Sequence, residues 1–187
     1  MSEEGEGERR SGVGWNGLAA VIASMIGALA LGVSAYTAYL QRMQVRAQVW
    51  PHLMLVNFDT ELTIKALNKG VGPAIVRSTR VTVDGKPMRS WSEVMGALGL
   101  EKTSFRLSTI SNNVIAGGEV LPILVLDEAD AFQQVRMAAE QRIVVEICYC
   151  STLNECWVTG DEATSSRWAQ TQVDACPVMG AGEAFAD

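Results

Sequence analysis

The hydrophobic and polar positions divide this chain of 187 residues into two parts with different periodicities. No charged side chain stands between Arg10 and Arg42, and most positions inside this interval are apolar. A helix needs about 20 such residues to cross a hydrocarbon core of roughly 30 Å. The pattern predicts a transmembrane helix over residues 15–40 and a juxtamembrane helix over residues 41–49, so membrane lipid is the first expected partner.

Small residues recur at every fourth position of the predicted transmembrane helix, so they lie along one of its faces. Small side chains at that spacing allow a second helix to approach closely in lipid, although Ala and Gly are also frequent in such helices for other reasons. The partner that this face predicts is another membrane protein or a second copy of the chain in a homodimer. The helix-packing candidates are Ala20, Ser24, Ala28 and Gly32.

A cleaved signal peptide is the main alternative to an anchor, because Val33-Ser34-Ala35 resembles a small-residue cleavage site. The apolar run exceeds the roughly 7–15 residues usual for a signal peptide, and the segment before it is net acidic. Both observations favour an uncleaved single-pass anchor. Its orientation stays open, because arginines flank both ends and the positive-inside rule weighs them equally.

After Trp50-Pro51 the pattern changes to short β-branched runs separated by turn signals, of which Asp84-Gly85 is the strongest. About seven short strands with turns every 8–12 residues or so are typical of an antiparallel sandwich. We therefore expect a mainly-β domain over residues 50–177, an immunoglobulin-like sandwich with one or two inserted short helices. The clearest helix outside the anchor is predicted over residues 127–141, with Asp127 as its cap.

The two ends of the chain lack the apolar side chains that a packed core requires. Residues 1–14 are rich in Glu and Gly, so we expect a disordered acidic head. Residues 178–187 are expected to form a flexible tail for the same reason.

All four cysteines stand late in the chain. Residues two apart in a strand point to the same face, so Cys148 and Cys150 share one face. A hairpin loop over residues 151–155 returns Cys156 close to Cys150, within reach of a disulfide bond. The preferred pairing is Cys150 with Cys156 and Cys148 with Cys176, although four cysteines allow three pairings.

Three states of these cysteines stay open. Two disulfides require an oxidising compartment and place the domain outside the cytoplasm. A four-thiolate zinc site suits a cytoplasmic domain, but the C-x-C spacing lacks the usual pairs separated by about two to four residues. Unlinked buried thiols are the third state, because free cysteine is often a small core residue. The disulfide interpretation is preferred, and it predicts a periplasmic C-terminal domain.

Residues with recognisable chemistry are few. His52 is the single histidine, and the chain has no nucleophile elbow, phosphate-binding loop or dinucleotide fingerprint. The acidic cluster Asp127, Glu128 and Asp130 lacks the spacing of a calcium loop and suits a helix N-terminus better. The net charge of −6 argues against nucleic acid as a partner. We predict no catalytic residue, no cofactor and no metal, and therefore no enzyme.

The strings VWPHL, LNKGVGPAIV, VTVDGKP and ICYCS followed by ECW resemble those of small, uncharacterised single-pass membrane proteins of proteobacteria. The resemblance covers residues 41–157. It implies a bacterial inner-membrane location and a C-terminal β-rich domain, and it carries no activity.

Two functions follow as hypotheses. The first is a membrane-anchored, non-enzymatic β-sandwich that binds another membrane or envelope protein or stabilises an envelope complex. The alternative is a cytoplasm-facing sensor or effector that signals through association of transmembrane helices.

Overall fold

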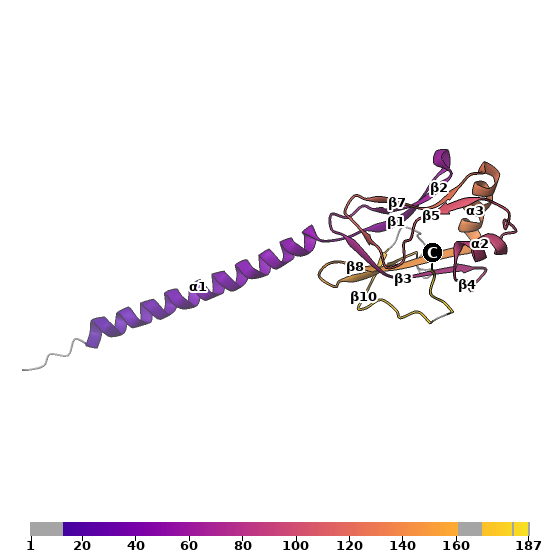
Figure 1. Cartoon of the computed structure of the whole chain (residues 1–187). Coiled ribbons are helices and arrows are strands. Elements are labelled where there is room, and N and C mark those ends of the chain that lie inside the picture. Colours follow the sequence, from indigo (N-terminus) through magenta and orange to yellow (C-terminus); the bar gives the residue numbers. More distant parts are fainter. Residues whose placement is uncertain (1–12, 161–169, 181, 187) are drawn as a thin grey trace, which may run out of the picture. The chain divides into compact units, whose positions relative to one another are not determined.

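The structure is a computed structural model that describes residues 13–160, 170–180 and 182–186. The chain divides into two compact units, Met1–Val45 and Arg46–Asp187 (Figure 1). Each unit is described separately below.

Helix α1 (Val13–Gln48) contains 36 residues, about 54 Å at roughly 1.5 Å per residue. It is long and apolar enough to span a membrane. The predicted transmembrane and juxtamembrane helices are therefore one continuous helix. It ends before Trp50-Pro51, where proline forces the preceding residue into extended geometry. The hydroxyls of Ser24, Ser34 and Thr37 each donate to a carbonyl four residues earlier at 2.8 Å, which satisfies them without water.

In its described residues, the second unit contains two antiparallel sheets and a few helices, as the pattern of short strands predicts. The first sheet has the strand order β1 (Leu53–Phe58), β2 (Thr63–Asn68), β7 (Val120–Leu126), β5 (Phe105–Leu107). The second sheet has the order β10 (Gln170–Val173), β9 (Cys156–Thr159), β8 (Ile143–Cys150), β3 (Ala74–Val83), β4 (Lys86–Met88), and β6 (Val114–Ile115) also pairs with β3. The helices are η1 (Asp59–Glu61), α2 (Trp91–Ala97) and α3 (Ala129–Gln141).

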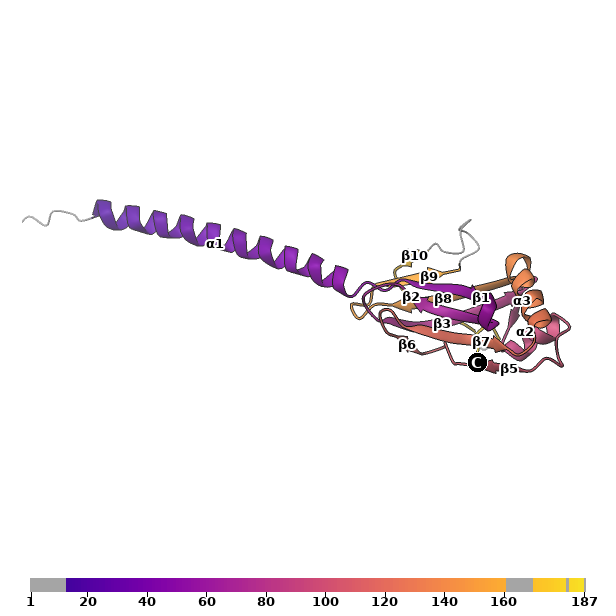
Figure 2. The ribbon, with the colours of Figure 1, turned by 90° about the horizontal axis from the view of Figure 1, so that it is seen from above.

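One hydrophobic core joins both sheets and the two α-helices of this unit. Leu53 and Leu124 of the first sheet, Val81 and Tyr149 of the second sheet and Phe132 of α3 are all fully buried in it. Figures 1 and 2 show the sheets as two layers, with α2 and α3 together at one end of them. The part of the β domain that the structure describes therefore shares one core, as a length of about 135 residues leads us to expect.

Two predicted turns have the expected geometry. Asp84 and Gly85 join β3 to β4 with φ values of 52° and 74°, the left-handed region that a type I′ hairpin requires. The Arg142 guanidinium donates to both carboxylate oxygens of Asp84 and lowers the pKa of that carboxyl below its ordinary value. The loop over residues 151–155 joins β8 to β9 as predicted.

The buried side chain of Asn68 organises the glycine-rich turn after β2. Its Oδ1 accepts hydrogen bonds from the backbone nitrogens of His52 and Gly70, and its Nδ2 donates to the carbonyls of Gly72 and Ile115. All four hydrogen-bonding positions of the amide are therefore used, which removes the cost of burying it. The Asn-x-Gly-x-Gly string thus has a structural role.

Two expectations need correction. Helix α3 begins at Ala129 with Glu128 at its N-cap, and the predicted cap Asp127 instead pairs with Arg106 at 3.3 Å.

The expected flexible tail over residues 178–187 includes Phe185, which is buried at 3% exposure and packs edge-on against Trp91. An aromatic residue surrounded by small and polar neighbours gave no periodic signal, so its long-range packing was missed.

Candidate functional site

Both cysteine pairs lie on the face of the second sheet that points away from the first sheet. Strand β8 alternates, so Ile147 and Tyr149 face the core while Cys148 and Cys150 face outward, as predicted. The Sγ atoms of Cys148 and Cys176 are 2.06 Å apart, and those of Cys150 and Cys156 are 2.12 Å apart. Both pairs of sulfurs are at disulfide distance, in the pairing preferred from the sequence.

The hairpin between β8 and β9 brings Cys156 opposite Cys150. Ser151 fixes this loop: its Oγ accepts from the backbone nitrogens of Leu153 and Glu155, and its backbone nitrogen donates to the Glu155 carbonyl. Asn154, at φ 58°, supplies the left-handed residue of the turn, a conformation that Asn adopts more readily than most residues. Local sequence alone therefore determines the Cys150–Cys156 pair.

The Cys148–Cys176 pair depends on the C-terminal segment. Strand β10 adds to the edge of the second sheet beside β9, and Cys176 follows three residues after its end. Further along, the Phe185 backbone nitrogen donates to the Thr79 carbonyl, and its carbonyl accepts from Ser111 Oγ at 2.9 Å. The disulfide attaches this segment to the outer face of the second sheet, and Phe185 attaches it to the β3 backbone and to the core.

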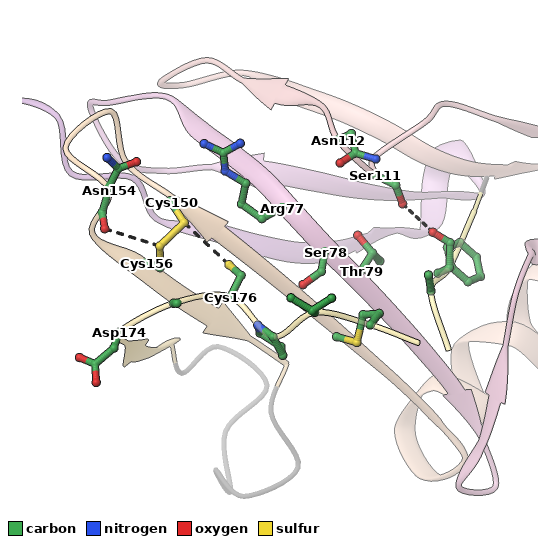
Figure 3. Close-up of a pocket in the computed structure, with 16 residues that line it drawn as sticks. Arg77, Ser78, Thr79, Ser111, Asn112, Cys150, Asn154, Cys156, Asp174 and Cys176 are labelled. Carbon is green, nitrogen blue, oxygen red and sulfur yellow. Dashed lines mark hydrogen bonds between the residues drawn. A yellow bond between two sulfur atoms is a disulfide. The ribbon is translucent and has the colours of Figure 1, made fainter. Parts of the chain in front are cut away.

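A pocket of about 560 Å³ lies beside this segment (Figure 3). Figure 3 shows Cys150, Cys156 and Cys176 gathered at one end of the pocket and Ser111 at the other. A second pocket of about 280 Å³ shares Pro177, Val178 and Met179 with the first and is lined by Cys148. The segment after Cys176 therefore borders both pockets.

The pocket wall includes an irregularity of strand β3. Val76 pairs with Tyr149 and Ser78 with Cys148, so Arg77 is an extra residue in a β-bulge. Arg77 is exposed and lines the larger pocket. Ser78 Oγ and Thr79 Oγ1, which follow it, are buried with no hydrogen-bond partner among the residues that the structure describes.

Of the residues that line this pocket, the cysteines were singled out from the sequence, but Arg77, Ser78 and Thr79 were not. The one available signal was Arg77-Ser78, which interrupts the apolar alternation of the strand Ala74–Val83. Bulges are common beside binding sites, because they redirect a side chain. The sequence did not reveal that the C-terminal segment would face this bulge.

Hydrogen bonds and burial fix the Tyr149 side chain, which lies on the core face of β8. Tyr149 Oη accepts from the Leu53 backbone nitrogen at 3.1 Å and donates to Gln170 Oε1 at 2.5 Å. Burial raises the pKa of Tyr149 to about 12, and the hydrogen bond from Leu53 opposes that shift. Arg80 pairs with Glu146 across β3 and β8 on the outer face.

The remaining sequence-based candidates lie apart from the pockets. His52 stacks at 5.4 Å on Trp50 and lines neither pocket. Asp127 and Glu128 stand before α3, as a helix N-terminus favours. The helix-packing candidates Ala20, Ser24, Ala28 and Gly32 are exposed on α1. Most of the predicted acidic head over residues 1–14 is outside the described residues.

Comparisons with protein-family models, with curated proteins and with solved structures found no match. The resemblance to proteobacterial single-pass membrane proteins therefore stays a prediction.

Proposed function

We propose that this chain is a single-pass protein of a bacterial inner membrane whose β domain is a non-enzymatic interaction module in the periplasm. In this proposal the domain, interpreted as an immunoglobulin-like sandwich, binds another membrane or envelope protein or stabilises an envelope complex. The apolar helix α1 supports the anchor. The two cysteine pairs at disulfide distance support an oxidising compartment, because cytosolic thiols are kept reduced.

The observation that carries the proposal is the pocket of about 560 Å³ on the outer side of the second sheet. Its C-terminal border presents Val178 at 98% exposure, beside the exposed guanidinium of Arg77 and the exposed amides of Asn112 and Asn154. Arginine and methionine are enriched at protein interfaces, and Arg77 and Met179 both line this pocket. The hydroxyls of Ser78 and Ser111 line the pocket without a histidine to activate them, since His52 lies elsewhere. The surface therefore suits binding better than acyl transfer.

The compartment can be tested by thiol labelling of spheroplasts that contain the full-length protein. We expect an impermeant maleimide to modify all four cysteines only after an impermeant phosphine has reduced them, as counted by mass after denaturation. Labelling that needs membrane permeabilisation and no reductant would contradict the periplasmic location. The cytoplasm-facing sensor or effector would then be the better hypothesis.

The interaction surface can be tested by site-specific photo-crosslinking in cells. A photoreactive residue at Val178 or Asn154 should give one adduct of defined mass, and the same group at Val120 on the first sheet should not. Arg77→Glu should weaken the adduct formed from Val178. Adducts of equal yield from both sheets, or none from the second sheet, would contradict an interface at this face.

A further inference from the structure

The four cysteine sulfurs form one continuous cluster. Besides the two bonded pairs, the Sγ atoms of Cys150 and Cys176 lie 3.8 Å apart. The Sγ atoms of Cys150, Cys156 and Cys176 all lie within 4.8 Å of one another, and Cys148 is bonded to Cys176. Strand β8 places Cys148 and Cys150 on one face, so the two bonded pairs bring all four sulfurs to one place.

The contact between Cys150 and Cys176 has the length of an edge in a tetrahedral zinc–thiolate site. Zinc–sulfur bonds measure about 2.3 Å, and the edge of a regular tetrahedron is roughly 1.63 times its centre-to-corner distance, or about 3.8 Å. The bonded pairs can reach the same separation after reduction by rotation of the cysteine side chains about their Cα–Cβ bonds. Thiolate ligands favour zinc over magnesium or calcium, which prefer oxygen ligands.

The backbone around the cluster is held by contacts that do not depend on the disulfides. Cys148 and Cys150 belong to β8, which pairs with β3 from Ile143 to Cys150. Cys156 begins β9, which pairs with β8 on one side and β10 on the other. Reduction alone therefore leaves these strands paired, and Cys176 stays close because β10 ends three residues before it.

Charge and access also suit a metal ion. Zinc with four thiolates carries a net charge of −2, which nearby cations stabilise. Arg77 lines the larger pocket together with Cys150, Cys156 and Cys176, and the carboxylate of Asp174 lines it too. Arg80 lines the smaller pocket with Cys148 but is paired with Glu146, so Arg77 is the cation that this argument depends on. The two pockets give a dithiol and a hydrated ion a path to the sulfurs.

We infer that Cys148, Cys150, Cys156 and Cys176 form a redox-dependent zinc site, a role beyond the proposed interaction function. Each disulfide takes two electrons and two protons from a dithiol, which is itself oxidised to a disulfide. The four thiols then bind one Zn²⁺ as thiolates and release up to four protons. Two disulfides cross-link the oxidised domain. In the reduced domain, one metal ion cross-links the same four cysteines.

The inference can be tested by cobalt titration of the full-length protein in detergent, before and after reduction with a phosphine. The reduced protein should bind one equivalent of Co²⁺, with the visible bands and sulfur-to-metal charge transfer of a tetrahedral thiolate site. One equivalent of Zn²⁺ should displace it. The oxidised protein should bind none. Circular dichroism of each sample reports whether the β domain stays folded.

Two ligand variants and one matched control complete the test. Cys148→Ser and Cys176→Ser should each lower the cobalt affinity of the reduced protein by about 100-fold or more, since even outer-shell changes cost 10–100-fold or so. Met179→Leu removes a soft thioether that borders both pockets and should leave the affinity unchanged.

Three results would overturn the inference. None of them affects the proposed interaction function, which is tested by photo-crosslinking of the oxidised protein. The first is a folded, reduced protein that binds less than one equivalent of cobalt. The second is a spectrum that Cys148→Ser and Cys176→Ser leave unchanged. The third is a reduced protein that loses its β-type signal and does not regain it with zinc.

Discussion

The phenol oxygen of Tyr149 lies 3.1 Å from the backbone nitrogen of Leu53, which donates a hydrogen bond to it. Tyr149 belongs to β8 of the second sheet and Leu53 begins β1 of the first. Both residues are fully buried. One side-chain hydrogen bond between residues 96 positions apart therefore links the two sheets beneath the cysteine cluster.

Tyr149→Phe should destabilise the β domain by about 1–3 kcal/mol, because it leaves the buried Leu53 N–H without its acceptor. The ring itself still fills the core beside Trp157. Denaturant unfolding of the full-length protein in detergent measures the difference. Tyr39→Phe on α1 removes an exposed hydroxyl and is the matched control, which should leave the unfolding midpoint of the β domain unchanged.

The raised pKa of Tyr149 predicts a loss of stability at high pH. A tyrosine titrates near 10 when unfolded and at about 12 here, so the folded state holds its proton more tightly. The stabilisation is complete below pH of about 10 and declines as the pH rises through about 12, by up to roughly 2–3 kcal/mol. Rapid-mixing unfolding across this interval should show the decline in the wild-type protein. An equally steep decline in Tyr149→Phe would assign it to other groups.

Gly85→Val should destabilise the domain by about 1–3 kcal/mol, because a β-branched residue at φ 74° is strained. No atom outside its neighbours lies within 4 Å of an added Cβ, so the effect is conformational rather than a clash. Gly96→Ala in α2 is the matched control, since its new Cβ meets only Glu101 Cγ at 3.9 Å. That control should be neutral or stabilising, and thermal unfolding of both variants distinguishes strain from general intolerance of substitution.

The sequence was most informative where a few neighbouring residues determine the geometry. Asp84-Gly85 predicted its turn because few dipeptides accept positive φ at both positions. The Cys150–Cys156 pair followed from strand alternation and a short loop. The apolar run up to Arg42 predicted most of α1 by length alone.

The remaining features depend on contacts between distant residues. The bulge at Arg77 appears only when β3 is aligned with β8, and the Ser111–Phe185 hydrogen bond joins positions 74 residues apart. The contact between Cys150 and Cys176 requires both the hairpin and the path of the C-terminal segment. Periodicity and turn signals describe one segment at a time, so they could not place the pocket.

Ala28→Leu should weaken self-association of α1 if the small-residue face packs against a second copy. A leucine at that position prevents the close approach of two backbones that small residues allow. Ala30→Leu adds the same volume about 200° around the helix, at roughly 100° per residue, and is the matched control. Energy transfer between labelled copies in lipid vesicles should fall for Ala28→Leu and stay unchanged for Ala30→Leu. Equal effects of both substitutions would argue against a specific homodimer.

The two disulfides should stabilise the oxidised domain unequally. Cys148 and Cys176 are 28 residues apart in sequence and Cys150 and Cys156 only 6, so the first pair removes more freedom from the unfolded chain. The loop-entropy relation gives a difference of about 1 kcal/mol between them, with each worth roughly 2–4 kcal/mol. Replacing each pair with alanines avoids a free thiol that could rearrange the other bond. Chemical unfolding should therefore show a lower midpoint for Cys148→Ala/Cys176→Ala than for Cys150→Ala/Cys156→Ala. The reverse order would mean that the C-terminal segment is held mainly by Phe185, through its contact with Trp91 and its hydrogen bonds to Thr79 and Ser111.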